Sequence, residues 1–307
     1  MSCETSYTRW DLYANLTDMR SVSVSHASLA QRIPPEMFFI ASALFHYIGP
    51  AFAVLLFARI GPPGVAWLRI ISAALIFALW QRPWRSFRGL STADRRTVIA
   101  LGVVLAAMNI TFYLALARLP LATVGAIEFL GPIALAAAGL RGPRNTVALV
   151  LAALGVHWLI DIRIEGAALG YVFAFANCAL FVLYIVLGHR IAADGGARGI
   201  HRLGIAMLVA ALAAAPLGIG DALPALRNPA LLAAGIGVGI CSSVIPYILD
   251  QLAMARLPRA TFALMLTLLP ATATVVGIVV LGQIPTPWEA AGIGLVIAGV
   301  ALHRRTT

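Results

Sequence analysis

One segment occurs twice in this 307-residue chain, and that repeat restricts the fold more than any other feature. ALARLPLATVGAIEFLGPIAL at 115–135 returns as AMARLPRATFALMLTLLPATA at 253–273, with the two ARLP motifs 138 residues apart. At the same offset Pro132 matches Pro270, and both copies lie inside long apolar runs. An internal repeat in such a chain is typical of membrane proteins in which a ligand passes between two related halves.

Composition places the chain in a membrane. Hydrophobic residues make up 61% of the sequence and charged residues 11%, whereas soluble domains spend roughly a quarter of their residues on Asp, Glu, Lys and Arg. So few charges cannot cover a globular surface in water, and lipid must contact most of it. The three cysteines, Cys3, Cys178 and Cys241, are widely spaced, so we expect neither a disulfide framework nor a metal site, and no cofactor.

Ten apolar segments approach the roughly 20 residues that an α-helix needs to cross a hydrocarbon core. Gly and Pro residues separate them, and they lack the alternation of membrane strands, so we predict an all-α integral membrane protein with ten transmembrane helices. These helices are expected at 36–58, 63–80, 97–117, 121–140, 144–160, 167–189, 203–219, 229–250, 260–281 and 287–303. We expect the polar tail at 1–33 to be cytoplasmic and not a cleaved signal peptide.

The arginines orient these spans. All 22 basic residues are arginine; 17 fall in the tail, the even-numbered loops and the C-terminal end, and four fall in the other loops. Positive charges favour the cytoplasmic side, so we expect a multi-pass protein with both termini in the cytoplasm. Topology thereby explains the net charge of +10, and we expect no nucleic-acid partner.

The ten predicted spans divide into five and five, since the 138-residue offset places span 4 on span 9. An odd number of spans per unit inserts the second unit upside down. We therefore predict two inverted five-helix repeats, at 34–160 and 161–307. Because sequence identity between the copies is concentrated around spans 3, 4, 8 and 9, we expect the substrate cavity beside those helices.

Ionisable residues at membrane depth are candidates for the site, because a charge there costs about 2.5 to 3.5 kcal/mol on insertion scales. Glu128 lies in span 4, and Gly131 and Pro132 follow it. Proline removes a helical hydrogen bond and exposes carbonyls, so we expect a helix break there and at the matching Pro270. Glu128 either faces a cavity, is held neutral between helices, or is paired with Arg69.

Two further charges and several polar residues complete the candidates. Arg69 in span 2 either neutralises a substrate carboxylate or extends to the membrane interface. Asp250, whose repeat counterpart is Phe112, is either a pathway carboxylate or an interfacial residue. His46 and His157 either relay protons or, more commonly for such histidines, only pack. Side chains that either hydrogen-bond a zwitterion or join helices are Asn109, Tyr113, Asn177, Tyr184, Tyr247 and Gln251.

The segments at 108–137 and 246–283 resemble the drug/metabolite transporter superfamily. Within it, the chain resembles the EamA-like ten-span transporters, most closely the threonine/homoserine exporter branch, over roughly 36–303. The resemblance implies proton-driven export of a small amino acid or related metabolite across a bacterial inner membrane. The residues that match the branch's pattern are Arg69, Glu128, Pro132 and Asp250.

The sequence departs from that pattern at two places. Relatives often carry Glu before the span 9 proline and Gly-Glu at the end of that span, whereas Leu269 and Gly282-Gln283 stand here. Glu128 and Asp250 are then left to carry any proton coupling. We expect the substrate ammonium near Glu128 and its carboxylate near Arg69, while rocking of the repeats opens the cavity to either side.

Two other functions stay open at this point. The same scaffold could carry drugs, nucleobases or pentose-type compounds. An integral membrane enzyme would need catalytic groups clustered at one membrane face, and the sequence contains no HExxH, GxSxG or P-loop motif. We therefore expect a transporter that contacts lipid, protons and a small-molecule substrate, and not an enzyme.

Overall fold

The computed structural model describes residues 33–119, 124–125, 127–132, 135, 143–159, 168–266, 269–281 and 286–302. Within these ranges the chain forms helices and short turns and no strand, which confirms the predicted all-α class. The tail at 1–32, part of predicted span 4 and Gly282-Gln283 lie outside the described residues.

The helices begin where the predicted dividing residues stand. Proline occupies the first turn of α2, α3 and α10, where its missing N–H would have no helical partner. Ser91 caps α5 by accepting a hydrogen bond from the Asp94 backbone nitrogen at 3.1 Å. The helices are α2 Pro35–Leu56, α3 Pro62–Gln81, α4 Trp84–Phe87, α5 Thr92–Leu116, α7 Pro143–Leu159, α8 Ala168–Ala192, α9 Gly196–Leu226, α10 Pro229–Gly239, the π-helix η1 Ile240–Val244, α11 Ile245–Met254, α12 Arg259–Met265, α13 Leu269–Leu281 and α14 Pro287–Leu302.

Among the described residues, six helical runs are long and apolar enough to cross a membrane. They are α2, α3, α5, α8, α9 and the continuous run Pro229–Met254, which comprises α10, η1 and α11. Predicted spans 5, 9 and 10 coincide with shorter helices, namely α7, α12 with α13, and α14. The chain is therefore a multi-pass helical membrane protein, and the count of ten spans stays a prediction.

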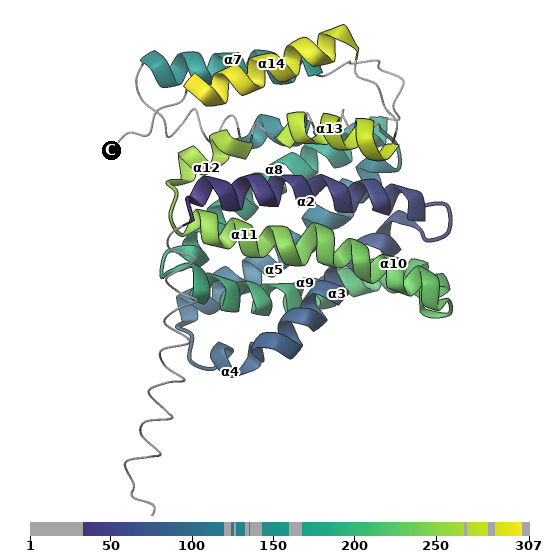
Figure 1. The fold of residues 1–307 in the computed structure, drawn as a ribbon. Coiled ribbons are helices and arrows are strands. Elements are labelled where there is room, and N and C mark those ends of the chain that lie inside the picture. The colour runs from purple at the N-terminus through teal and green to yellow at the C-terminus, as the bar shows by residue number, and fades with distance from the viewer. Residues whose placement is uncertain are drawn as a thin grey trace, which may run out of the picture.

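Helices from the two predicted halves interleave (Figure 1). The helix α3 packs along α9, α5 packs against α8 and α9, and α2 packs against α11 and α13. The helices α7 and α14 pair with each other at one edge of the bundle. Each of these contacts joins an element before residue 160 to one after it, so the two halves share one core.

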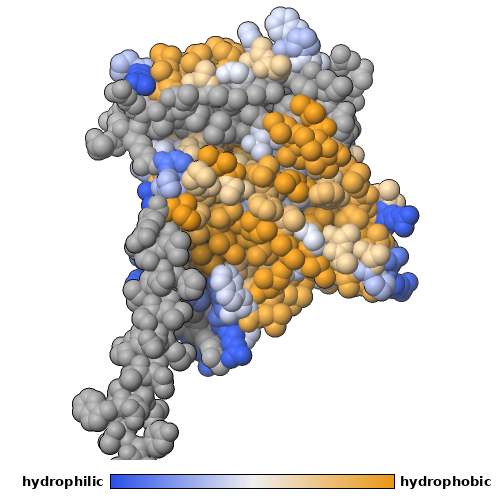
Figure 2. Space-filling view, viewed as in Figure 1, coloured by the Kyte–Doolittle hydropathy of each residue, from blue (hydrophilic) through white to orange (hydrophobic). Residues whose placement is uncertain are grey.

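The outer face of the bundle is apolar. On the face drawn in Figure 2, hydrophobic residues predominate over the helices, and hydrophilic ones gather toward the helix ends. Leu79, Leu212 and Val279 are among the most exposed side chains, at 81%, 77% and 77%. Continuous apolar surface of this kind is rare on soluble monomers and suits contact with lipid.

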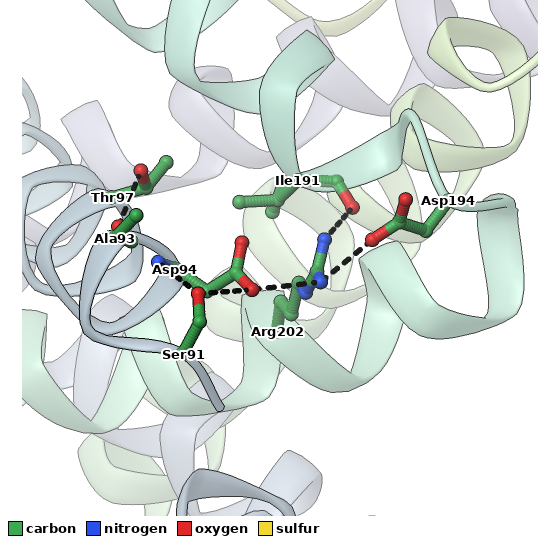
Figure 3. A network of polar contacts seen from close by, with 7 residues as sticks. All are labelled: Ser91, Ala93, Asp94, Thr97, Ile191, Asp194 and Arg202. Carbon is green, nitrogen blue, oxygen red and sulfur yellow. Dashed lines mark hydrogen bonds and ion pairs between the residues drawn. The ribbon is translucent and has the colours of Figure 1, made fainter. Parts of the chain in front are cut away.

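An ion cluster joins the two halves at a helix end (Figure 3). Arg202 of α9 lies 2.7 Å from Asp194, between α8 and α9, and 3.5 Å from Asp94 in the first turn of α5. Arg202 also donates a hydrogen bond to the Ile191 carbonyl at 3.3 Å. Asp94 and Asp194 therefore lie on the same side of the bundle, as the charge-based topology requires of these two loops.

Two more contacts join segments that the predicted topology places on the same side of the membrane. Arg256 donates a hydrogen bond to the Ile33 carbonyl at 2.7 Å. Arg144 donates one to the Leu302 carbonyl at 2.7 Å. The loop before α12 thus contacts the start of α2, and the start of α7 contacts the end of α14.

Candidate functional site

A small cavity lies inside the bundle. Its volume is about 20 Å³, close to the space that one water molecule needs. It is lined by His46, Tyr47 and Pro50 of α2, Arg69 of α3, Met108, Asn109 and Phe112 of α5, Glu128, and Asn177 of α8. The structure thus brings together five of the residues named as candidates from the sequence, and it adds Tyr47. The five are His46, Arg69, Asn109, Glu128 and Asn177.

Glu128 faces this cavity from a helical segment that packs closely on α8. Its carboxylate accepts a hydrogen bond from Asn177 Nδ2 at 2.8 Å, and the residue is 6% exposed. Gly131 makes the approach possible, because a Cβ there would lie 2.5 Å from a methyl of Val182 and 3.1 Å from the Cys178 carbonyl oxygen. Pro132 is helical and buried beside it.

Arg69 is 3% exposed, so its side chain is packed inside the bundle. Its Nε donates to Ser243 Oγ at 2.7 Å, and its Nη2 donates to the Ser242 carbonyl. Two tyrosine hydroxyls lie farther away, Tyr113 at 3.4 Å and Tyr247 at 3.5 Å. Among the described residues Arg69 forms no ion pair with Glu128, although both line the cavity.

The π-helix η1 supplies the Arg69 contacts. A π-turn widens the helix and releases carbonyls from the regular ladder, which leaves the Ser242 carbonyl able to accept from Arg69. Small residues let the neighbouring helices approach η1. A Cβ on Gly49 would overlap Ser242, and one on Gly239 would overlap Ser72. Glycine at both positions therefore allows α2 and α3 to pack closely against this part of the chain, which keeps Arg69 near η1.

Asn109, which lines the cavity, contacts Tyr247. The Asn109 amide donates to the Leu105 carbonyl at 2.7 Å and to the Tyr247 hydroxyl at 3.4 Å. These two residues are 138 apart, which is the offset between the sequence repeats. The contact therefore joins equivalent positions of the two halves.

Asp250 forms a second buried acidic group outside the cavity lining. It accepts hydrogen bonds from Ser42 Oγ at 2.6 Å and from the Tyr184 hydroxyl at 2.8 Å, and it is 2% exposed. Its side chain is therefore packed among helices of the bundle. Gln251 is also buried but packs beside Gly199 and Met254, away from the cavity. His157 is exposed on α7.

A larger apolar groove lies between α2 and α10. Its volume is about 390 Å³, and glycines, apolar side chains and Cys241 line it. Two of its side chains, Phe52 and Leu55, are 48% and 60% exposed on the apolar outer face. The groove contains no charged group that could bind a zwitterion, so the smaller polar cavity is the candidate site.

Comparison with known proteins identifies the family of this chain. Residues 168–304 match the EamA-like transporter family. The chain is 34% identical to the threonine/homoserine exporter RhtA of Escherichia coli strain K12 over 253 residues, which is 81% of this chain and 84% of that protein. It is 32% identical to the RhtA protein of Salmonella typhimurium strain LT2 over 257 residues, with the same shares covered.

A solved crystal structure shares the fold at low sequence identity. The two chains are 18% identical with a TM-score of 0.58, and the match covers 85% of this chain and 95% of the other. The relatives named above are threonine/homoserine exporters. The chain belongs to the EamA-like transporter family.

Proposed function

We propose that this protein exports a small neutral amino acid of the threonine or homoserine type across the bacterial inner membrane, in exchange for protons. The observation that carries the proposal is the cavity that Glu128 and Arg69 share. A zwitterion needs hydrogen-bond acceptors for its ammonium and donors for its carboxylate. Glu128 supplies the acceptors, and the Arg69 guanidinium with the Tyr113 and Tyr247 hydroxyls supplies the donors.

The repeat organisation is proposed as ten spans in two inverted units, 34–160 and 161–307. The Asn109–Tyr247 contact supports it, because in a structure with twofold symmetry a residue touches its own equivalent only near the axis. The ion cluster of Asp94, Asp194 and Arg202 supports the part of the proposed topology that puts these two loops on one side, and the distribution of arginines supports the assignment of that side to the cytoplasm.

Transport proceeds by alternating access. A cavity of about 20 Å³ is too small for an amino acid, so the substrate enters only when the helices around it separate. Rocking of the two units then exposes the cavity to one side and the other. Protonation of Glu128 from outside removes the charge that holds the substrate ammonium, which releases the substrate and resets the carrier.

Export of another metabolite, such as a drug, a nucleobase or a pentose-type compound, is the alternative on the same scaffold. The paired acidic and basic groups of the cavity favour a zwitterion over these compounds. A substrate panel separates the two cases.

The test is uptake of labelled threonine and homoserine by inside-out vesicles, with and without an imposed proton gradient. We expect gradient-dependent uptake by the intact protein and its loss in Glu128→Gln. Glu36→Gln, the same chemical change in the first turn of α2, serves as the matched control and should retain uptake. Uptake of neither amino acid by the intact protein would refute the substrate class, and normal uptake by Glu128→Gln would refute the role of that carboxylate.

A further inference from the structure

Two buried polar atoms at the cavity have no hydrogen-bond partner among the described residues. They are the Tyr47 hydroxyl and Asn177 Oδ1, and both residues line the cavity with Glu128. Tyr47 is 1% exposed and Asn177 is fully buried. Leaving such a group unpaired is costly, and folded proteins satisfy nearly all of them, so a pair of them at one cavity points to a ligand.

The chemistry of the two atoms differs. Asn177 Nδ2 already donates to Glu128, so its Oδ1 is an acceptor that adds to the acceptors of the carboxylate. An ammonium carries only donors and fits this acceptor pair. The Tyr47 hydroxyl can both donate and accept, so it fits a ligand group that does the same. A hydroxyl is such a group.

The surroundings of Tyr47 leave its hydroxyl open to the cavity. Its ring is held in α2 beside His46, with ring centroids 6.4 Å apart. A Cβ on Gly125 would lie 3.5 Å from the hydroxyl, so the missing side chain at that position leaves free space beside it. Apart from Tyr47, the hydroxyls near the cavity, those of Tyr113 and Tyr247, lie within hydrogen-bond reach of Arg69.

We propose that Tyr47 determines specificity, by hydrogen-bonding the side-chain hydroxyl of the transported amino acid. The inference rests on the proposed function and deepens it, since it restricts the substrates to hydroxyl-bearing small amino acids. Glu128 with Asn177 holds the ammonium, Arg69 holds the carboxylate, and Tyr47 recognises the group that threonine and homoserine share. A site that hydrogen-bonds a substrate hydroxyl disfavours the analogue without it, because its own polar group is then left unpaired.

The test compares threonine with 2-aminobutyrate, the compound left when the hydroxyl is removed from either threonine or homoserine. Competition against labelled threonine uptake in inside-out vesicles gives an apparent affinity for each. We expect the intact protein to prefer threonine by about tenfold or more, the value of one buried hydrogen bond. In Tyr47→Phe the preference should fall by about tenfold through weaker threonine binding, while 2-aminobutyrate competes as before.

Tyr171→Phe is the matched control, because it makes the same change in α8 away from the cavity lining, and it should keep the preference. An intact protein that binds threonine and 2-aminobutyrate equally would overturn the inference, even if Tyr47→Phe failed to fold. So would a Tyr47→Phe variant that keeps the preference, or one that weakens both ligands equally, which would assign Tyr47 to positioning Glu128. If the intact protein transports no amino acid, the proposed function fails first, and this inference fails with it.

Discussion

Gly131 offers a direct test of how the Glu128 segment is held against α8. In Gly131→Ala the new Cβ would lie 2.5 Å from a Val182 methyl and 3.1 Å from the Cys178 carbonyl oxygen, where ordinary contact needs at least 3.4 Å. Neither neighbour can yield easily, since valine is stiff at χ1 and the oxygen belongs to the backbone. Overpacking of this kind destabilises a fold by about 1 to 3 kcal/mol, and the better helix propensity of alanine offsets only about 0.5 to 1 kcal/mol of that.

We therefore expect Gly131→Ala to lower the free energy of unfolding by about 1 to 2 kcal/mol, or roughly 5- to 30-fold in the equilibrium constant. Unfolding of the detergent-solubilised protein by SDS, followed through the fluorescence of its six tryptophans, measures this change. Gly220→Ala is the control, because a Cβ there meets nothing within 4 Å, and it should be neutral or stabilising. Equal stability of the two variants would refute the close packing of Glu128 on α8.

Two further substitutions separate the roles of the remaining charges. Arg69→Lys should lower threonine uptake by tenfold or more, because one ammonium cannot replace the planar guanidinium that bonds both Ser243 and the Ser242 carbonyl. Near-normal uptake would argue against Arg69 as the group that binds the substrate carboxylate. Asp250→Asn removes the second buried carboxylate that is available for proton coupling, so uptake should become insensitive to the proton gradient. The affinity for threonine should change by less than about threefold, because Asp250 does not line the cavity. A loss of affinity as large as that of Glu128→Gln would instead place Asp250 in the binding site.

Much of the architecture could be predicted from the sequence, because lipid imposes simple rules. Backbone groups in the bilayer must bond within the segment, so apolar runs of sufficient length become helices, and prolines start them at α2, α3 and α10. Charges inside such runs are costly enough to be conspicuous. Arg69 and Glu128 were found for that reason, and the structure places both at the same cavity.

The orientation of individual side chains could not be predicted in the same way. The membrane helices are apolar on all sides, so no amphipathic pattern indicates which face of a helix is buried. Tyr47 and Ser42 therefore carry no signal in the sequence, although one lines the cavity and the other binds Asp250. The π-helix η1 has no signature in the sequence either, because Ser242 and Ser243 do not differ from other small residues of a membrane span.

The meeting of Asn109 and Tyr247 has a consequence for Asp250. If the two units exchange conformations, as inverted repeats do, each residue takes over the surroundings of the residue 138 positions away. Phe112 lines the cavity in this structure, and its counterpart is Asp250, which lies outside the lining. In the opposite state Asp250 would turn toward the substrate path and Phe112 would leave it. The Asp250 carboxylate, unlike Glu128, would then lie beside the substrate only in that opposite state, so it could take up a proton in one state and be shielded from the substrate path in the other.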